Sequence, residues 1–405
     1  MARQVKPGFP KVGWRGRSPA IGAVLLAAPL LVFLLLVYVA PISALLWRAV
    51  DNPEVVEHLP RTVSALADWD GRDLPPEVAF AALASDLVET QKNRTTAIVA
   101  RRANLAYPGL RSLLTTAGNR VSRMAPPYRD AFIALNADWA DPHIWRVLKH
   151  LGHPMTPDYM LAALDLRMAD GTLERMPEER VVHVPALGRT LWISLTVCFC
   201  CLLLGLPAAM LLAWAPPRLA GVLMVCVLMP FWVSLLARTT AWIVLLQNEG
   251  LLNKTLSFLD LISEPLPLMF NRAGVLIAMT HVLLPYMVLP LYATFRSIPR
   301  HLVQAALSLG ASPPRVLLKV CLPMAMPGIA AGCLLVIILA LGYYITPALV
   351  GGAGDQMIAY FIAYHVQTGL NWGMAAALSS VLLVALLLLY RLYRQLAGPA
   401  GARLI

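Results

Sequence analysis

Charged residues are scarce in this sequence, and acidic residues are almost absent from most of it. Asp, Glu, Lys and Arg together make up 14% of its 405 residues, while hydrophobic residues make up 59%. Of the 22 acidic residues, 18 lie between Asp51 and Glu179. Since an ordinary soluble domain is about one quarter charged, this composition indicates a membrane protein with a single charged segment.

Cysteine is missing from the charged segment, and recognisable catalytic motifs are missing from the whole sequence. The six cysteines, at positions 198, 200, 201, 226, 321 and 333, lie in or beside apolar runs, so we assign them no redox role. No Gly-Lys pair is present, which excludes a P-loop, and neither a Ser/His/Asp signature nor H-E-x-x-H occurs. We therefore predict no catalytic residue, no cofactor and no ATPase activity in this chain.

Basic residues gather at the ends of the apolar runs. Residues 1–19 carry five Lys and Arg residues and no acidic residue. Such a distribution is a signal of membrane topology, and it argues against a nucleic-acid partner despite the net charge of +11. We expect a bacterial inner-membrane protein in contact with the lipid bilayer, with both chain termini on the cytoplasmic side.

Six apolar runs are long enough to cross a bilayer as helices. They are Ala20–Leu46, Thr190–Trp214, Leu219–Leu246, Gly274–Phe295, Met324–Val350 and Trp372–Tyr390. A signal peptide is the alternative for the first run, but its apolar stretch is nearly twice the usual length of about 7–15 residues. We expect Pro285 and Pro290 to break the fourth span. The predicted fold class is an all-α membrane protein with six transmembrane helices.

The charged segment is predicted to be a mostly helical domain. Asp141 signals a helix start before an apolar stripe that Gly152 ends, and no alternating strand pattern is evident. His143, His150 and His153 lack an acidic or cysteine partner at a metal-ligand spacing, so we expect solvated or packed histidines and no metal site.

Three parts of the chain follow from these patterns. Residues 1–50 are the N-terminus and first span, residues 51–185 a periplasmic insert, and residues 186–405 a five-helix membrane domain. We expect the insert either to contact partner proteins over the outer mouth of a transport path or only to stabilise the membrane domain.

A polar corner interrupts the apolar runs between Gln304 and Pro323. Gly310 supplies the left-handed residue that ends one short helix, and Ser312 offers a hydroxyl to cap the next, in which Pro313 fits the first turn. Two helices at such a corner form a docking knob, and an ordinary amphipathic loop is the alternative.

The corner resembles the EAA loop of ABC-importer permeases, a pattern of Glu-Ala-Ala, three residues, Gly, nine residues, an aliphatic residue, any residue, and Leu-Pro. The residues at that spacing are Gln304, Ala305, Ala306, Gly310, Val320, Leu322 and Pro323. The resemblance implies that residues 300–323 form a coupling loop that sits in a groove of a cytoplasmic ATPase subunit. Gln304 replaces the family's Glu, which removes one charge from that contact.

Further segments resemble permeases of the spermidine/putrescine importers, from about Arg189 to Tyr390. They are PFWVSLLARTTAWIVLL, EPLPLMFNRAGVLIAMTHVLLPYMVLPLYATFRSIP and LALGYYITPALVGG. The resemblance implies a permease subunit that imports a small organic solute, a polyamine or related amine. It also implies two ATP-binding subunits, a second permease subunit and a periplasmic solute-binding protein as partners.

Polar and aromatic residues within two of the runs are candidates for the wall of a translocation path, because such residues are costly in contact with lipid. They are Phe231, Trp232, Ser234 and Arg238 in the third span, and Tyr343, Tyr344 and Thr346 in the fifth. The alternative is that the aromatic residues anchor the spans at the interface and Arg238 snorkels to the surface. Because the predicted spans contain no Asp or Glu, a cationic solute would meet only aromatic faces there.

Two other classes of protein remain to be distinguished. A membrane-anchored sensor would place a soluble domain between two spans, as here, but it needs a cytoplasmic output domain, and the cytoplasmic segments are short. A secondary transporter would show ionisable pairs in the membrane and internal repeats, and the sequence shows neither.

Overall fold

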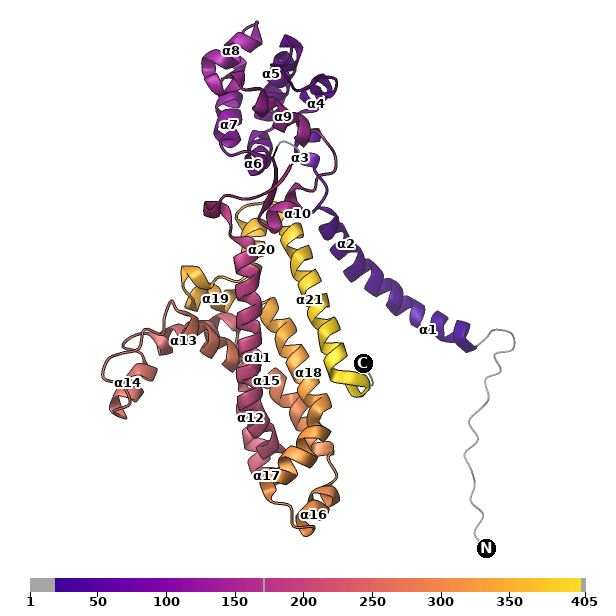
Figure 1. Ribbon diagram of the computed structural model, residues 1–405, viewed down its shortest axis with the longest axis vertical. Helices are drawn as coiled ribbons and strands as arrows, with labels where there is room; N and C mark the ends of the chain where they lie inside the picture. The colour runs from indigo at the N-terminus through magenta and orange to yellow at the C-terminus, as the bar shows by residue number, and fades with distance from the viewer. Residues whose placement is uncertain (1–18, 170–171, 402–405) are drawn as a thin grey trace. The chain divides into compact units, whose positions relative to one another are not determined.

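The computed structural model describes residues 19–169 and 172–401, and these residues are largely helical (Figure 1). The chain divides into two compact units, Met1–Trp47 and Arg48–Ile405. Among the described residues, the two strands β1 (Leu166–Ala169) and β2 (Thr172–Arg175) form a single antiparallel hairpin. The predicted all-α class is confirmed, with this hairpin as an addition.

The described residues of the first unit, 19–47, form one apolar helical run. It consists of α1 (Pro19–Leu34), a π-helical turn (Leu35–Val39) and α2 (Ala40–Trp47). The part from Leu26 to Trp47 is long and apolar enough to cross a membrane. The π turn ends two residues before Pro41, whose ring would collide with a carbonyl one turn earlier in a regular α-helix.

The insert begins the second unit, and its described residues form eight short helices. They are α3 (Pro53–Val56), α4 (Pro60–Ala67), α5 (Glu77–Lys92), α6 (Thr96–Ala106), α7 (Leu110–Arg120), α8 (Tyr128–Leu135), α9 (Pro142–Leu151) and α10 (Asp158–Ala163). Three 3₁₀ turns accompany them, at Val121–Arg123, Ala137–Ala140 and Glu178–Arg180.

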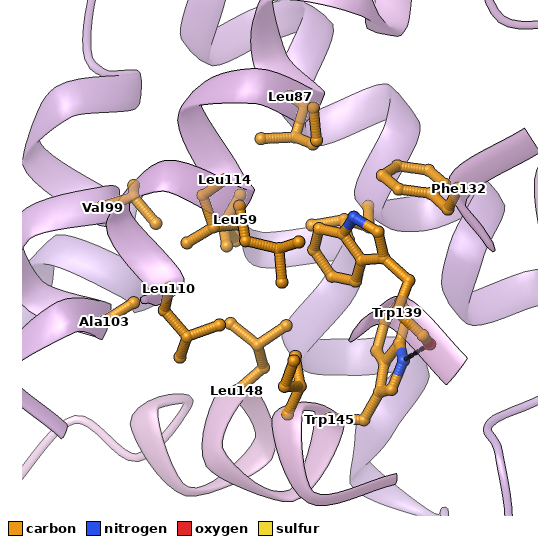
Figure 2. Packing of buried hydrophobic residues seen from close by; sticks show 14 of the residues in the cluster. Leu59, Leu87, Val99, Ala103, Leu110, Leu114, Phe132, Trp139, Trp145 and Leu148 are labelled. Carbon is orange, nitrogen blue, oxygen red and sulfur yellow. Dashed lines mark hydrogen bonds between the residues drawn. The ribbon is translucent and has the colours of Figure 1, made fainter. Parts of the chain in front are cut away.

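An aromatic cluster fills the middle of the insert (Figure 2). The rings of Phe80 and Trp145 meet edge to face with centroids 4.4 Å apart, and Phe132 packs on Trp139 at 5.0 Å. Trp145 satisfies its buried N–H by donating it to the carbonyl of Trp139, 3.1 Å away. Burial of such large rings stabilises an ordered domain of this size.

The helix signals of the insert locate α9 correctly. The Asp141 carboxylate accepts a hydrogen bond from the N–H of His143 at 2.8 Å, and Ile144 and Leu148 are buried. The β1–β2 hairpin escaped the sequence analysis because all four residues of β2 are exposed. A strand without a buried face has no alternation of polar and apolar residues to detect.

The rest of the second unit is the membrane domain. Its helices are α11 (His183–Trp214), α12 (Pro217–Trp232), α13 (Leu235–Leu246), α14 (Leu251–Phe258), α15 (Arg272–Ser297), α16 (Arg300–Ser308), α17 (Pro313–Val316), α18 (Leu322–Leu341), α19 (Ile345–Val350), α20 (Ile358–Gln367) and α21 (Trp372–Gly401). A π turn (Leu317–Cys321) joins α17 to α18, and a 3₁₀ turn (Ala353–Asp355) follows α19.

Helices α11, α15 and α18 form the packed centre of this domain, as their ribbons in Figure 1 suggest and their contacts show. Small residues permit the close approach. A Cβ atom on Gly328 of α18 would lie 2.2 Å from Oγ1 of Thr294 on α15, and one on Gly332 would lie 2.7 Å from the sulfur of Met287. Glycine is therefore required where these two helices cross.

The structure corrects three expectations about the spans. The third is not one helix, because α12 and the helical segment after it, Leu235–Phe258, meet at a bend of 104°. The fourth is not broken, since α15 continues through Pro285 and Pro290. The fifth ends at Leu341, and residues 345–350 form the separate helix α19. In all, the described residues contain five helices suited to crossing a membrane, or six if the bent pair is one span.

Candidate functional site

The corner between α16 and α17 closes with a specific hydrogen-bond pattern. The N–H of Ala311 donates to the carbonyl of Ala306 at 3.1 Å, and the N–H of Gly310 donates to that of Leu307 at 2.9 Å. This is a Schellman motif, and its left-handed position is Gly310 with φ +82°. The predicted role of Gly310 as the helix-ending residue is confirmed. A Cβ atom at this position would meet no other atom within 4 Å.

Helix α17 begins at the predicted residue but without the predicted cap. Ser312 occupies the N-cap position and Pro313 the first turn, yet the Ser312 hydroxyl makes no capping hydrogen bond. The expectation of a hydroxyl cap was wrong for a physical reason. Pro314 occupies the second helical position, so one of the two N–H groups that a capping oxygen would accept from is missing.

The two faces of the corner differ in burial. Ala306 and Ala311 pack against the apolar centre of the membrane domain, and Val316 is buried in it. Gln304 and Ala305 are exposed, and Leu309 is 89% exposed. One face therefore anchors the corner, and the other presents polar and apolar side chains with no partner within the described chain.

A π turn links the corner to α18. The N–H of Leu322 donates to the carbonyl of Leu317, five residues back, and Pro323 follows. The proline has no N–H and its ring excludes a carbonyl one turn earlier, which accounts for the widened turn. Leu322 is half-buried and Pro323 exposed, so the Leu-Pro pair shapes the joint between corner and membrane helix.

Arg238 holds the break between α12 and α13. Its Nη2 donates to the carbonyl oxygens of Pro230 and Val233, the latter at 2.8 Å. These carbonyls lie at the C-terminal end of α12, where the helix dipole is negative and favours a cation. Ser234 starts the next helix, because its Oγ accepts the N–H of Ala237 at 3.2 Å.

The other candidate path residues differ in their contacts and exposure. Thr346 of α19 meets Thr239, the neighbour of Arg238, through a buried contact of 3.2 Å between hydroxyl oxygens. The ring of Phe231 lies 4.9 Å from that of Tyr286 on α15, which sequence reasoning did not single out. Trp232 is 74% exposed, while Tyr343 and Tyr344 are half-buried at the turn between α18 and α19.

His281 of α15 has a hydrogen-bond partner on a neighbouring helix. Its Nδ1 accepts a hydrogen bond from Nε1 of Trp242 at 3.2 Å, and the two rings lie 5.2 Å apart. This hydrogen bond links α13 to α15.

The chain is similar in sequence to known membrane transport proteins. The sequence profile of the binding-protein-dependent transport system inner membrane component family matches residues 203–398. The spermidine/putrescine transport system permease protein PotB of Salmonella typhimurium (strain SL1344) is 34% identical over 212 residues, which are 52% of this chain and 74% of that protein. The inner membrane ABC transporter permease protein YdcU of Escherichia coli (strain K12) is 32% identical over 250 residues, covering 55% of this chain and 78% of its own.

A solved structure also shows similarity. The bacterial alginate ABC transporter in complex with a periplasmic protein bound to alginate pentasaccharide contains a chain that aligns with a TM-score of 0.45 and 16% sequence identity. The alignment covers 54% of this chain and 79% of that one.

The chain is therefore a multi-pass membrane protein of the transport class. It belongs to the family of binding-protein-dependent transport system inner membrane components, and it is a permease subunit of an ABC importer in the inner membrane. The resemblance to permeases of the spermidine/putrescine type is confirmed. A membrane-anchored sensor is not favoured by these findings, and the insert lies outside the residues that the family profile matches.

Proposed function

We propose that this permease forms part of the translocation path for a small organic solute, a polyamine or related amine, and that separate ATPase subunits drive it. Two ATP-binding subunits, a second permease subunit and a periplasmic solute-binding protein complete the transporter. The similarity to PotB supports the solute class, and membership of the permease family supports the set of partners.

The corner between α16 and α17 carries this proposal. Its inner face is fixed by Ala306 and Val316, and its outer face exposes Gln304 and Leu309. A rigid knob with one anchored face and one free face is suited to insertion into a groove of another protein. We propose that this groove belongs to an ATPase subunit and that residues 300–323 transmit its closure to α18.

The proposed orientation follows from charge. Four basic residues border or belong to the corner: Arg296, Arg300, Arg315 and Lys319. No acidic residue lies between Glu264 and Asp355. Positive charge concentrates on the cytoplasmic side of membrane proteins. The corner and both termini are therefore cytoplasmic in this proposal, and the insert is periplasmic.

The solute path is proposed along the broken span. The rings of Phe231 and Tyr286 lie 4.9 Å apart and are tilted by 57° to each other, and Tyr343 lies at the turn before α19. Aromatic faces attract an ammonium group through cation–π interaction, worth about 0.5–2 kcal/mol each depending on desolvation.

Uptake by the reconstituted transporter tests the proposed function. Proteoliposomes would contain this chain, the partner permease and the ATPase subunits, with loaded binding protein outside and ATP inside. We expect ATP-dependent accumulation of labelled putrescine or spermidine, and none with a non-hydrolysable nucleotide. Accumulation that does not depend on ATP or on the binding protein would contradict the proposal.

A further inference from the structure

The insert is fastened to the membrane domain at its own end and by two further contacts near the start of α21. At its own end, the Asp165 carboxylate accepts the backbone N–H groups of Val182 at 3.2 Å, His183 at 3.1 Å and Val184 at 2.7 Å. It therefore satisfies donors at the start of α11 that have no partner within the helix. The long helix α11 thus starts on a residue of the insert rather than after a free linker.

The second attachment is the contact between Tyr159 of α10 and Gly373 of α21. A Cβ atom on Gly373 would lie 2.5 Å from Cε2 of Tyr159, so the ring rests directly on the helix backbone. Tyr159 is 1% exposed. Figure 1 shows α10 at the beginning of α21, although more than 200 residues separate them in sequence. This contact needs glycine on one side and a flat ring on the other.

The Tyr159 ring is held from within the insert. Its hydroxyl donates to Oε1 of Glu54 at 3.3 Å, and the guanidinium of Arg102 lies 4.8 Å from its centroid. Arg102 is 2% exposed and donates to Oδ1 of Asn52 at 2.6 Å and to Oδ2 of Asp158 at 2.7 Å. These bonds hold the guanidinium over the ring of Tyr159, while Nη1 of Arg102 and Oε2 of Glu54 have no hydrogen-bond partner among the described residues.

The charge on Asp158 is part of this support. Burial raises the pKa of its carboxyl group, but hydrogen bonds and charges from His150 and Arg102 outweigh that effect and hold the pKa well below its ordinary value. The carboxylate therefore stays ionised at neutral pH and remains bonded to Arg102.

A third attachment ties the insert to the turn before α21. Arg101 of α6 donates from Nη1 to the carbonyl oxygen of Gly369. The same turn caps α21, because Oδ1 of Asn371 accepts the N–H of Met374 at 3.0 Å. Residues 374–378 then continue as a fully buried stretch of α21, which packs against α18.

We propose that Tyr159 and Arg101 are positioning residues that fasten the insert to the start of α21, so that the two move as one body during transport. The inference rests on the proposed function and adds a mechanical link to it. Because α21 packs on α18, and α18 begins beside the α16–α17 corner, a protein bound to the insert acts on the same helices as the ATPase subunits. An insert tethered only by flexible segments would leave α21 free of it.

Distance measurement between spin labels tests the common motion directly. Cysteines replace the exposed residues Ser85 in the insert and Thr368 before α21, in an assembled transporter whose native cysteines are replaced. We expect the same mean distance without nucleotide and in the vanadate-trapped state, whose trapping is verified by loss of ATP hydrolysis. A change of more than about 5 Å between the two states, the size of a one-turn helix shift, would overturn the proposal.

A matched pair of glycine variants tests the function of the link. Gly373→Ala pushes the Tyr159 ring away, whereas Gly354→Ala places its Cβ in open space. We expect Gly373→Ala to keep basal ATP hydrolysis but to lower its maximal stimulation by the loaded binding protein about fivefold, a typical coupling between sites. The binding-protein concentration at half-maximal stimulation should stay the same, and Gly354→Ala should behave like the wild type.

Further outcomes distinguish a coupling role of the Tyr159–Gly373 contact from a role in stability alone. Equal maximal stimulation in the two glycine variants would contradict the proposal. Tyr159→Phe retains the ring and should stimulate like the wild type, while Tyr159→Ala should match Gly373→Ala. If the Gly373→Ala transporter does not assemble, the spin-label distances, measured in a protein that keeps Gly373, still show whether the insert and α21 move together. Failure of wild-type uptake would contradict the proposed function, whereas normal uptake with an independently moving insert would contradict this inference alone.

Discussion

At Gly310 the backbone adopts φ +82°, a left-handed conformation that costs a residue with a Cβ atom roughly 1–2 kcal/mol. Open space surrounds the position, so the constraint comes from the backbone alone. Backbone geometry at one residue thereby sets the angle between α16 and α17, and with it the shape of the exposed face that includes Gln304 and Leu309.

Two substitutions at Gly310 separate backbone strain from side-chain bulk. Gly310→Val should weaken co-purification of the ATPase subunits, because a β-branched residue is poorly tolerated in the left-handed region. Gly310→Asn should retain them, since asparagine tolerates that region. Quantified ATPase subunit per permease after affinity purification provides the measurement, and equal retention by both variants would argue against the corner as the docking element.

A titratable pair in the insert predicts a pH effect at the residue scale. The hydrogen bond that His150 donates from Nε2 to the Asp158 carboxylate raises the pKa of His150 above its ordinary value of 6.5. Because the folded pKa is the higher one, the stabilisation is fully present below pH 6.5 and is lost as the pH rises through the raised value. Its size is limited by solvent, since the His150 side chain is 43% exposed.

Hydrogen exchange of α9 and α10 in the full chain, corrected for the intrinsic effect of pH, measures this contribution. Protection in the wild type should fall as the pH rises above 6.5 relative to His150→Gln, whose amide hydrogen-bonds but does not titrate. Parallel pH profiles for the two proteins would contradict the assignment.

At the scale of elements, the crossing of α15 and α18 depends on small residues. Gly328 faces Thr294 and the carbonyl of Pro290, which a Cβ atom would approach to 2.2 Å and 2.8 Å. Overpacking of this kind typically costs about 1–3 kcal/mol. We expect Gly328→Ala to lower the midpoint of thermal unfolding in detergent, and Gly221→Ala, whose Cβ meets nothing, to leave it unchanged. Equal midpoints for the two variants would show that the helices accommodate the added methyl group without loss of stability, and would contradict this prediction.

The break between α12 and α13 is a feature that the hydrophobic pattern of the sequence does not predict. The apolar run from residue 219 to residue 246 is long enough for one span, and its hydrophobicity contains no trace of the 104° bend. The bend depends on the local hydrogen bonds of Arg238 and Ser234, which periodicity does not report. By contrast, the α16–α17 corner was predictable, because Gly310 and Pro313 act through their own backbone restrictions.

Arg238 supplies a prediction for this break. Arg238→Met removes the donors to the carbonyls of Pro230 and Val233 and should destabilise the protein, since a lost charge-assisted hydrogen bond costs about 1.5–3 kcal/mol. Arg238→Lys keeps the charge and should have a smaller effect. Thermal unfolding of the purified protein measures both, and an order reversed between Lys and Met would contradict the capping role.

For the whole molecule, the decisive property is which parts face which side of the membrane. Patterns in the sequence predicted the helical class and a count of six spans, which agrees with the described residues if the bent pair is one span, because length and hydrophobicity are properties of the chain itself. The attachment of the insert to α21 was not predictable, since Tyr159 and Gly373 are brought together only by the fold. The orientation that we propose rests on the basic residues around the corner and can be tested on intact cells.

Single cysteines at two exposed serines test this orientation in one experiment. Ser85 lies in the insert and Ser312 in the corner, and both are exposed. With the native cysteines replaced, a membrane-impermeant maleimide that reaches the periplasm should label Ser85→Cys in intact cells. Ser312→Cys should be labelled only after the inner membrane is opened, because the basic residues of the corner favour the cytoplasmic side. Labelling of Ser312→Cys in intact cells, with Ser85→Cys protected, would invert the proposed topology and remove the corner from the reach of an ATPase subunit.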